Sequence, residues 1–275
     1  MSGVLLDDTA HSAWMASETN ECQGLTLELP LNIFRLAETM HSGRLIMLSE
    51  QGENYLKGIY ELQSQGGKVS TSLLSERLGV SSASVTEMLQ RLADDEMVDY
   101  TPYKGVALTS EGQRQALRII RRHRLWELFL VEVLRFTWDE IHDEAERLEH
   151  IMSERLEERI DAVLGHPRFD PHGHGIPSSD GLISSESHPL LADAVAGSTV
   201  AVVRVSDENP EILQYLSKLG IGIGTPIDIA ERISFDGSLR VRVGSNEHFV
   251  SEKLAQHVSV VTTAPGAMKG ASDGG

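Results

Sequence analysis

The chain has 275 residues, long enough for two domains, and its 40% hydrophobic content is typical of soluble globular proteins. No apolar run approaches the roughly 18 residues of a membrane span and no basic segment with an apolar core opens the chain, so we expect a cytoplasmic protein with no membrane partner. The single cysteine, Cys22, excludes an internal disulfide, and the formal net charge of −17 disfavours a nucleic-acid partner unless basic residues gather on one face.

Residues 1–48 show little sustained periodicity and are interpreted as an N-terminal extension. The folded pattern starts at Glu50, and apolar residues then recur at helical spacing from Glu53 to Leu62. A short helix begins at a cap among residues 70–72 and ends before Gly79. A tight turn leads to the helix SSASVTEMLQRLADDEM. Helix, tight turn with glycine and second helix form the helix-turn-helix signature.

The segment MVDYTPYKGVALT predicts two short strands around a turn, which is the wing of a winged helix. A helical hairpin with a β-ribbon and no DNA role is the alternative. Between Thr101 and Arg124 there are six basic residues and one acid, Glu111, which favours a phosphate-contacting module over residues 49–115. The outer face of the second helix is small and mostly polar, as entry into a major groove requires. The expected DNA contacts are Ser81, Ser82, Ala83, Ser84, Thr86, Glu87, Gln90 and Lys104.

Two helices carry potential metal ligands at helical spacing. A long helix runs from about Ser110, where the box SEGQ predicts a cap, and the next helix lies in DEIHDEAERLEHIM, residues 139–152. Residues at i, i+4, i+7 and i+8 share one helix face, and imidazole with carboxylate suits Mn, Fe, Co or Zn. A solvated acidic face is the alternative, but it does not explain why both helices show the pattern. The candidate ligands are His123, Glu127, His142, Glu146, Glu149 and His150.

The same region predicts a helical dimerisation and metal-binding domain over residues 116–165. Trp126, Phe136 and Trp138 are expected to fill the core between its helices, the last of which runs from Ser153 and ends before Gly165.

The amino-acid composition and the pattern of apolar residues change twice after Gly165. Residues 166–197 are rich in Pro, Gly, Ser and His and are interpreted as a linker. Residues 198–263 show short alternating runs that predict a small antiparallel barrel containing one amphipathic helix, NPEILQYLSKLG, and residues 264–275 have the composition of a tail. The predicted fold is therefore a mainly α N-terminal half, a winged helix-turn-helix plus a helical dimerisation domain, followed by a small all-β barrel.

From Glu50 to about Pro177 the chain resembles the DtxR/MntR family of metal-dependent transcriptional repressors. The strings ENYLKGIYEL, GVSSASVTEMLQRL, YKGVALTSEG, RRHRLWELFL and HDEAERLEHIMS occur in family order, and the last is the specific one. The barrel segment resembles the SH3-like domain of longer members. The resemblance implies a homodimer that binds double-stranded operator DNA with an inverted repeat only when loaded with Mn(II) or Fe(II). Such a protein represses metal-uptake genes and is not an enzyme.

The resemblance also implies ligand sets. The primary site would use Glu146, Glu149, His150 and the first-helix residue Asn54. The ancillary site would use the pair at 123 and 127, with the histidine at 142 in some branches. The string DPHGHGIP resembles a motif of streptococcal-type manganese regulators whose equivalents of Asp170 and His172 join the ancillary site, although a loop without an ion is an open alternative. Further ancillary candidates are Asp170, His172 and Asp207.

Two departures from the family pattern bear on the metal. Iron-type members place a thiol where this chain has Glu146, so the hard carboxylate favours Mn(II), with Fe(II) as the alternative. Asn54 stands where manganese regulators usually carry Asp and iron regulators Met; a cap of the first helix is its alternative role. Two rival functions remain open: a winged-helix regulator of a non-metal ligand, and a metallohydrolase, for which no HExxH string appears.

Overall fold

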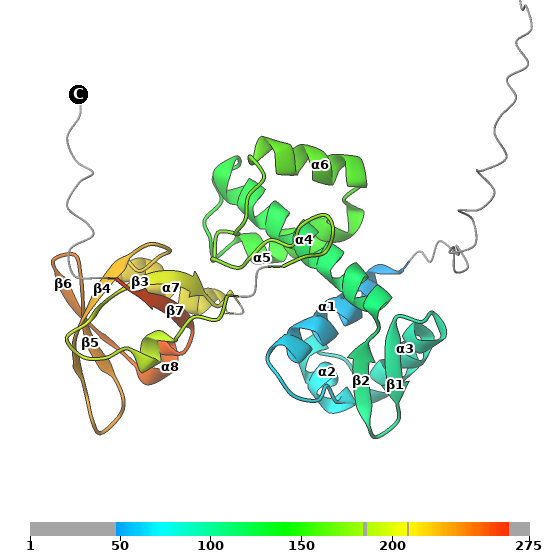
Figure 1. The fold of residues 1–275 in the computed structure, drawn as a ribbon, viewed down its shortest axis with the longest axis horizontal. Coiled ribbons are helices and arrows are strands. Elements are labelled where there is room, and N and C mark those ends of the chain that lie inside the picture. The colour runs from blue at the N-terminus through cyan, green and yellow to red at the C-terminus, as the bar shows by residue number, and fades with distance from the viewer. Residues whose placement is uncertain (1–47, 184–185, 208, 264–275) are drawn as a thin grey trace, which may run out of the picture. The chain divides into compact units, whose positions relative to one another are not determined.

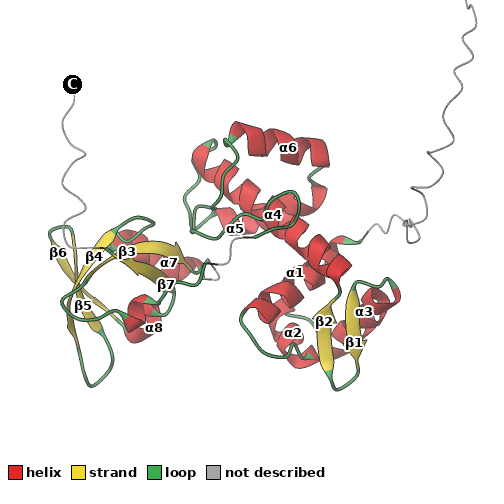
Figure 2. Cartoon of the chain, in the orientation of Figure 1, coloured by secondary structure: helices red, strands yellow, loops and turns green. Residues whose placement is uncertain are grey.

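The computed structural model describes residues 48–183, 186–207 and 209–263, so the predicted N-terminal extension and tail lie outside the described residues (Figure 1). The first half is helical apart from one hairpin (Figure 2). Its elements are α1 (Glu50–Ser64), α2 (Thr71–Leu78), α3 (Ser82–Asp94), β1 (Val98–Thr101), β2 (Gly105–Leu108), α4 (Ser110–Glu132), α5 (Ile141–Leu148), the 3-10 turn η2 (Glu149–Ile151) and α6 (Glu154–Val163).

The winged helix follows from capped amphipathic helices. The side chains of Ser70 and Ser81 cap α2 and α3 by accepting from backbone N–H groups three residues on, and Gly79 ends α2 in the left-handed region at φ 65°. Strands β1 and β2 pair antiparallel and form the wing. The apolar faces of α1, α2, α3 and the hairpin meet in one core, as predicted; its fully buried members include Tyr55, Leu56, Ile59, Leu74, Val85 and Leu89.

Helix α4 connects the wing to the remaining helices. Its cap is Thr109, whose hydroxyl accepts from the backbone N–H of Gly112, so the predicted cap at Ser110 is off by one residue. A Cβ atom at Gly112 would lie 1.9 Å from the carbonyl oxygen of Met97, so only glycine allows α4 to start this close to β1. The helix then packs against α1, α5 and α6, which places one rigid element between the winged helix and the metal-ligand pattern.

The segment predicted as a linker begins with a folded loop. Phe169 and Gly175 form an isolated antiparallel bridge, and the N–H of Ile176 donates to the carbonyl of Arg168 at 2.8 Å. Ile176 is buried in a small core with Leu125 of α4. Composition predicts high polarity here but misses that one apolar anchor fixes the loop.

The C-terminal part contains the predicted antiparallel sheet. Its strand order is β6-β5-β4-β3-β7 (Figures 1 and 2). The predicted amphipathic helix is α7, and the run HFVSEKLAQHVSVV, expected as one stretch, divides into β6, one capped turn and β7. The elements are η3 (Leu191–Asp193), β3 (Thr199–Val205), α7 (Pro210–Lys218), β4 (Pro226–Arg232), β5 (Leu239–Val243), β6 (Asn246–Val250), α8 (Glu252–Ala255) and β7 (Val258–Thr262).

The three aromatic residues expected between the helices have separate environments. Trp126 packs in the small core around Leu125. Phe136 is 38% exposed, because it lies in the loop after α4, so its predicted core position is wrong. Trp138 packs against the C-terminal core, and its indole N–H donates to the hydroxyl of Ser217 at 2.6 Å. None of the described helices is both long and apolar enough to cross a membrane.

Candidate metal centres and DNA-binding surface

The helix carrying the predicted ligand pattern is shorter than its sequence suggests. The α-helix ends at Leu148, and Glu149 and His150 lie in the 3-10 turn η2. A 3-10 turn has about three residues per turn, so it changes the direction of the last two candidate side chains relative to a continuous α-helix. The side chain of Glu149 is fully buried, whereas that of Glu146 is 42% exposed. The four predicted ligands of this segment, His142, Glu146, Glu149 and His150, therefore belong to two neighbouring clusters and do not form one continuous helix face.

We call the predicted ligands Asn54, Glu146, Glu149 and His150 the first centre. Donor atoms of Glu146, Glu149 and His123 lie within 4.8 Å of one another, and Asn54 and Glu146 line the same cavity. Nδ1 of His150 lies 2.6 Å from a carboxylate oxygen of Glu53, and its Nε2 lies 3.6 Å from Glu149 Oε1. In the part of the chain that the structure describes, neither Asn54 Oδ1 nor His150 Nε2 has a hydrogen-bond partner, although both atoms are buried. Buried polar atoms without partners are costly, so a ligand for them is expected. These donors fit a divalent cation.

Asn54 does not cap the first helix. Helix α1 begins four residues before it, and its cap is Ser49, whose hydroxyl accepts from the N–H of Gly52 at 3.1 Å. The alternative role considered for Asn54 is therefore excluded, which leaves its buried side-chain oxygen without a structural function.

Lys57, which the sequence patterns did not single out, lies in the first centre. Its ammonium donates to Glu146 at 2.9 Å and to both oxygens of Glu149 at 3.0 and 3.1 Å. Burial disfavours the charged ammonium, but the charges of the two glutamates outweigh it and raise the pKa of Lys57. The feature of the sequence that could have indicated Lys57 is its position one turn after Asn54, on the same face of the first helix.

His123 lies between the first centre and a second cluster. Its Nδ1 is 2.5 Å from Glu149 Oε2, and its Nε2 is 3.2 Å from Glu127 Oε1. Burial and the charge of Lys57 lower its pKa, but Glu127 and Glu149 outweigh them and raise it to about 9. A protonated ring donates to both glutamates at once, so His123 joins the two clusters electrostatically.

The second cluster, the second centre, surrounds Glu127 of α4. Glu127 Oε1 lies 3.6 Å from His142 Nδ1 and 3.8 Å from His172 Nδ1, and His172 Nδ1 lies 4.0 Å from Asp207 Oδ2. The carboxylate is fully buried, and its Oε2 has no hydrogen-bond partner among the described residues. Donor atoms of Glu127, His172 and Asp207 lie within 4.8 Å of one another, as do those of His123, Glu127 and His142.

The loop after Phe169 supplies the remaining donors. Asp170 Oδ1 accepts from the N–H groups of His172 and His174 at 2.9 Å each, which folds the loop into a tight turn. Asp170 Oδ2 lies 3.3 Å from His174 Nδ1 and 3.5 Å from Nε of Arg124. His174 was not among the predicted ligands. The sequence signal for it was its i, i+4 spacing from Asp170, which is meaningful only when the loop is known to turn.

His172 has one nitrogen available for a cation. Its Nε2 donates to the carbonyl oxygen of Trp138 at 2.9 Å, and the two rings stack with centroids 5.8 Å apart. Because Nε2 donates to a carbonyl, Nδ1 is the atom that faces Glu127 and that a cation can bind once its proton has left, which is the orientation that metal-binding histidines show. Burial lowers the pKa of His172, but Glu127, Asp170 and Asp207 outweigh it and raise it to about 9.

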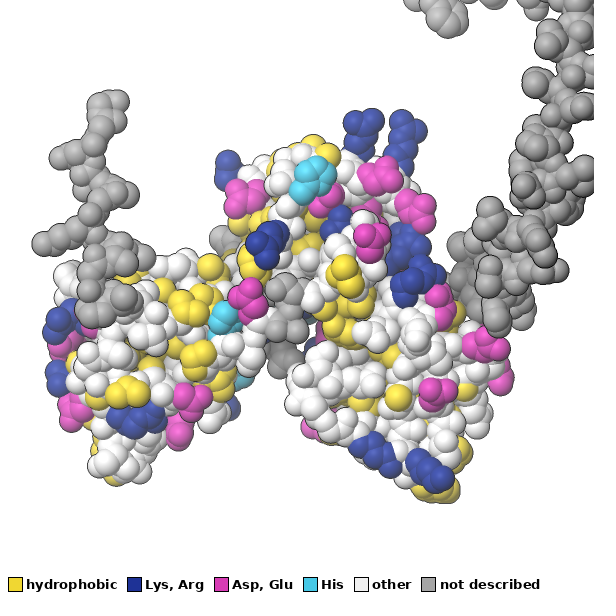
Figure 3. Space-filling view, viewed as in Figure 1, with side chains coloured by type: hydrophobic (Ala, Val, Ile, Leu, Met, Phe, Trp, Pro, Cys, Tyr) yellow, Lys and Arg dark blue, Asp and Glu magenta, His cyan; other side chains and the backbone are white. Residues whose placement is uncertain are grey.

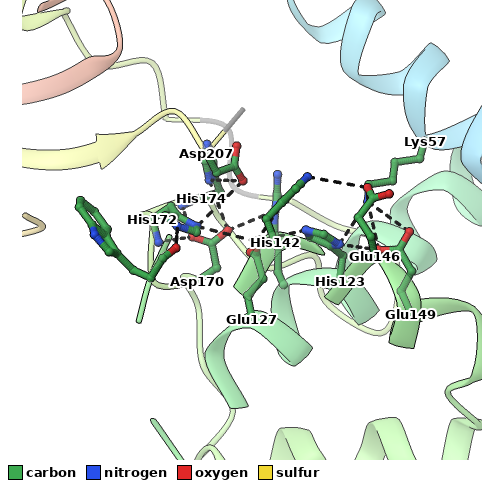
Figure 4. Close-up of polar contacts among 12 residues, drawn as sticks. Lys57, His123, Glu127, His142, Glu146, Glu149, Asp170, His172, His174 and Asp207 are labelled. Carbon is green, nitrogen blue, oxygen red and sulfur yellow. Dashed lines mark hydrogen bonds and ion pairs between the residues drawn. The ribbon is translucent and has the colours of Figure 1, made fainter. Parts of the chain in front are cut away.

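Because His172 has one nitrogen available, two groups of possible metal ligands that both include it describe one ion position. The groups Glu127, His172, Asp207 and Asp170, His172, His174 share His172, and its Nε2 is already bonded to the carbonyl oxygen of Trp138. A single lone pair binds one ion, so both groups can only surround the same position. Figure 4 shows the resulting series of contacts, which runs from Lys57 and Glu149 through His123 and Glu127 to the loop histidines and Asp207.

The predicted DNA-contacting side chains lie mostly on the surface. All are exposed except Thr86, which is half-buried. Three hydroxyls are already engaged: Ser81 caps α3, the hydroxyls of Ser81 and Ser84 lie 2.9 Å apart, and Thr86 donates to the carbonyl of Ser82 at 2.9 Å. Glu87 pairs with Arg91 one turn later. Ala83, Ser84, Gln90 and the wing residue Lys104 leave the face small and accessible, as a groove-binding helix requires.

The predicted basic face is only partly present. Arg121 and Arg122 are buried and share Glu157, whose oxygens lie 3.0 Å from each of their Nε atoms, so the prediction that they contact phosphate is wrong. Arg118 pairs with Glu154 at 2.5 Å, and Arg124 donates to the carbonyl of Gly175. Acids distant in sequence neutralise these arginines, which local charge counting misses. On the face drawn in Figure 3, Lys and Arg alternate with Asp and Glu.

Three family models match the described part of the chain. The N-terminal DNA-binding domain of iron-dependent repressors matches residues 47–106, their metal-binding and dimerisation domain matches 109–178, and the FeoA domain matches 190–262. These ranges follow the winged helix, the helical region with its loop, and the C-terminal sheet.

Relatives of known function and solved structures agree with these models. The iron-dependent repressor IdeR of Mycobacterium leprae is 34% identical over 163 residues, 57% of this chain and 71% of the relative. The diphtheria toxin repressor of Corynebacterium efficiens is 34% identical over 194 residues, 66% and 84% of the two chains. A solved manganese-dependent transcriptional repressor in complex with manganese is 40% identical with a TM-score of 0.72, covering 77% of this chain and all of that one. The manganese regulator SloR is 33% identical with a TM-score of 0.64, covering 77% and 98%.

Proposed function

The chain belongs to the family of iron-dependent repressors, which are metal-dependent regulators of transcription, and from this premise we propose that it binds an inverted-repeat operator as a homodimer when loaded with Mn(II). Fe(II) is the alternative ion, and genes for metal uptake are the proposed targets. The observation that carries the proposal is the convergence of buried donor atoms without hydrogen-bond partners, among the described residues, next to a winged helix.

The first centre would hold an ion with Asn54, Glu146, Glu149 and His150. Both carboxylates and the amide oxygen are hard donors, and the imidazole is compatible with them. The described donors include no thiolate, which supports manganese over softer metals. The relatives include both iron and manganese repressors by name, so family membership alone leaves the ion open.

The second centre would hold an ion with Glu127, Asp170, His172, His174 and Asp207. His123, His142 and His172 all lie nearest to the same oxygen, Glu127 Oε1, at 3.2, 3.6 and 3.8 Å, so an ion bound to that oxygen would have an imidazole from α4, α5 or the loop within reach. Arg124 and the carbonyl of Trp138 would orient Asp170 and His172 from outside the ligand set.

A bound divalent cation would join Glu146 and Glu149 to the amide of Asn54. Asn54 lies on α1, which also supplies Tyr55, Leu56 and Ile59 to the winged-helix core. Helix α1 therefore transmits the position of the first centre to the DNA-binding unit. In a dimer, recognition helices held about 34 Å apart match one turn of DNA, which is the geometry that a palindromic operator selects.

We further propose that the recognition surface consists of the exposed face of α3 from Ser81 to Gln90 together with Lys104, and that residues 116–165 form the dimerisation domain. Six large apolar side chains of this domain are exposed, and the most exposed are Ile151 at 76% and Val163 at 67%. Exposed apolar side chains of this kind favour a partner subunit that covers them. The proposed division is an extension (1–48), DNA-binding domain (49–115), dimerisation domain (116–165), linker (166–197), SH3-like domain (198–263) and tail (264–275).

The test is binding of an inverted-repeat promoter fragment, measured by gel shift and by sedimentation, with Mn(II), with Fe(II) kept reduced, and with excess chelator. We expect a dimer, or paired dimers, on DNA only when metal is present. Equal affinity in chelator would contradict metal control and favour the rival regulator that responds to a non-metal ligand.

A further inference from the structure

Lys57 is a charged residue buried in the middle of the first centre. Its side chain is 8% exposed, and its ammonium contacts one oxygen of Glu146 and both oxygens of Glu149 within 3.1 Å. Lysines are almost never buried unless they are paired, and a buried unpaired carboxylate is costly. Lys57 is therefore an internal counterion of the fully buried Glu149, together with His123, whose Nδ1 lies 3.2 Å from the ammonium.

The oxygens that Lys57 contacts are those expected to ligate the ion. Carboxylate oxygens bind divalent cations at about 2.0–2.6 Å. Three oxygens each about 3 Å from the ammonium define a small space, and an ion bonded to the same oxygens would lie within it or directly against the ammonium. Two cations that close repel each other strongly when solvent is excluded. The ammonium and the ion thus compete for one set of carboxylate oxygens.

We propose that Lys57 is a built-in competitor of the metal: its ammonium must leave Glu146 and Glu149 before the first centre can be loaded. This inference rests on the proposed metal-binding function of that centre. The partly exposed Glu146 marks the side on which the ammonium can reach solvent, since Glu149 on the other side is fully buried. Metal affinity is then an exchange of one cation for another.

The exchange of the ammonium for a metal ion also affects how α1 of the winged helix is held against α5 and η2. Lys57 and Asn54 lie one turn apart on α1, so they approach α5 and η2 from the same helix. With the ammonium in place, α1 is tied to Glu146 and Glu149 through Lys57. With an ion in place, α1 is held to Glu146 and Glu149 through Asn54 and the ion. Lys57 therefore sets the metal concentration at which the position of α1 comes under metal control.

The competition predicts opposite effects of one substitution on stability and affinity. In Lys57→Met the two glutamates lose their counterion, so the melting temperature in chelator falls. The same change removes the competitor, so Mn(II) binds the first centre at least tenfold more tightly. With saturating Mn(II), the melting temperature of Lys57→Met is expected to match that of the unmodified chain. A purely structural lysine would lower both melting temperatures and leave the affinity unchanged or weaker.

The experiment is calorimetric titration of the full chain with MnCl2, carried out in a His142→Ala/His172→Ala background, in which each donor group of the second centre lacks a ligand and the heat reports the first centre. Lys57→Gln serves if Lys57→Met folds poorly, because it keeps a hydrogen-bond donor without the charge and is expected to show the same tightening. Lys57→Arg keeps the charge and is expected to show none. Lys253→Met, an exposed lysine on α8, is the matched control for loss of one positive charge.

The outcomes separate the inference from the function on which it rests. Absence of Mn(II) binding in the unmodified chain would overturn the proposed function itself. Binding in the unmodified chain with equal or weaker affinity in both Lys57→Met and Lys57→Gln would overturn the competition alone. Equal tightening in Lys253→Met would also overturn it, because the effect would then reflect net charge.

Discussion

The loop that carries the second centre lies against the backbone of Val203 at Gly173, where a Cβ atom would be 2.0 Å from the Val203 carbonyl oxygen. Gly173 has a φ of 86°. The backbone of the neighbouring His172 is fixed on both sides, because its N–H donates to Asp170 and its carbonyl accepts from the N–H of Val205. Close approach of the loop to β3 brings Asp207, two residues beyond that strand, within reach of the loop histidines.

Replacing Gly173 with alanine is therefore expected to separate the loop from β3 and weaken Mn(II) binding at the second centre at least tenfold. Gly165→Ala is the matched control, because Gly165 has a similar φ of 74° but nothing within 4 Å of an added Cβ. Both variants lose about 1–2 kcal/mol from the left-handed conformation. Calorimetric titration with MnCl2 measures the difference. A loss of affinity in Gly165→Ala equal to that in Gly173→Ala would show that backbone strain, and not the contact with β3, is responsible.

The sequence predicts well what depends on local periodicity. Capped amphipathic helices and alternating strands place the winged helix, α4 and the C-terminal sheet close to where the structure has them, and the family comparisons confirm the fold and the class of regulator. It predicts poorly what depends on distant contacts. Arg121 is basic in sequence, but Glu157 and Asp161 of α6 neutralise it. Lys57 and His174 became candidates only when α1 and the loop were brought against Glu149 and Asp170.

Asn54 and Ser49 separate metal binding from helix stability. Asn54→Asp adds a carboxylate next to Glu146 and Glu149, so Mn(II) is expected to bind more tightly, while repulsion among three acids lowers stability in chelator. Asn54→Ala removes the uncharged donor and should weaken metal activation. Ser49→Ala removes the α1 cap, which costs about 1 kcal/mol of unfolding free energy. Titration with MnCl2 and thermal melting measure both properties. If Ser49→Ala changed the affinity as much as Asn54→Ala, the amide would have no specific role at the ion.

DNA recognition and metal binding are expected to separate by substitution. Gln90→Ala on the exposed face of α3 should weaken operator binding by about 1–3 kcal/mol, the usual value of one base contact, and leave Mn(II) affinity unchanged. His150→Ala removes a nitrogen donor and should weaken both. Gel shifts at fixed salt, combined with calorimetry, measure the two affinities. Metal-dependent repression retained by His150→Ala in a reporter strain would show that the first centre is misplaced.

The last prediction concerns His174, the ligand candidate that the sequence did not indicate. Its Nδ1 is buried without a hydrogen-bond partner among the described residues and lies 3.3 Å from Asp170 Oδ2 and 3.8 Å from Asp207 Oδ2. Two carboxylates and one imidazole directed at the same point are a donor set that suits a divalent cation. His174→Ala is expected to weaken the second-centre ion at least tenfold and leave the first centre unchanged.

His166→Ala is the control for that prediction, because His166 also pairs with an aspartate, Asp161 at 2.7 Å, but its side chain is 74% exposed. Titrations monitored at both centres, with His150→Ala isolating the second, give the affinities and the number of ions bound. The second centre then requires His174 if its affinity falls in His174→Ala alone. Unchanged affinity in that variant would mean that Glu127, Asp170, His172 and Asp207 hold the ion without it, and that His174 serves only to neutralise the two aspartates.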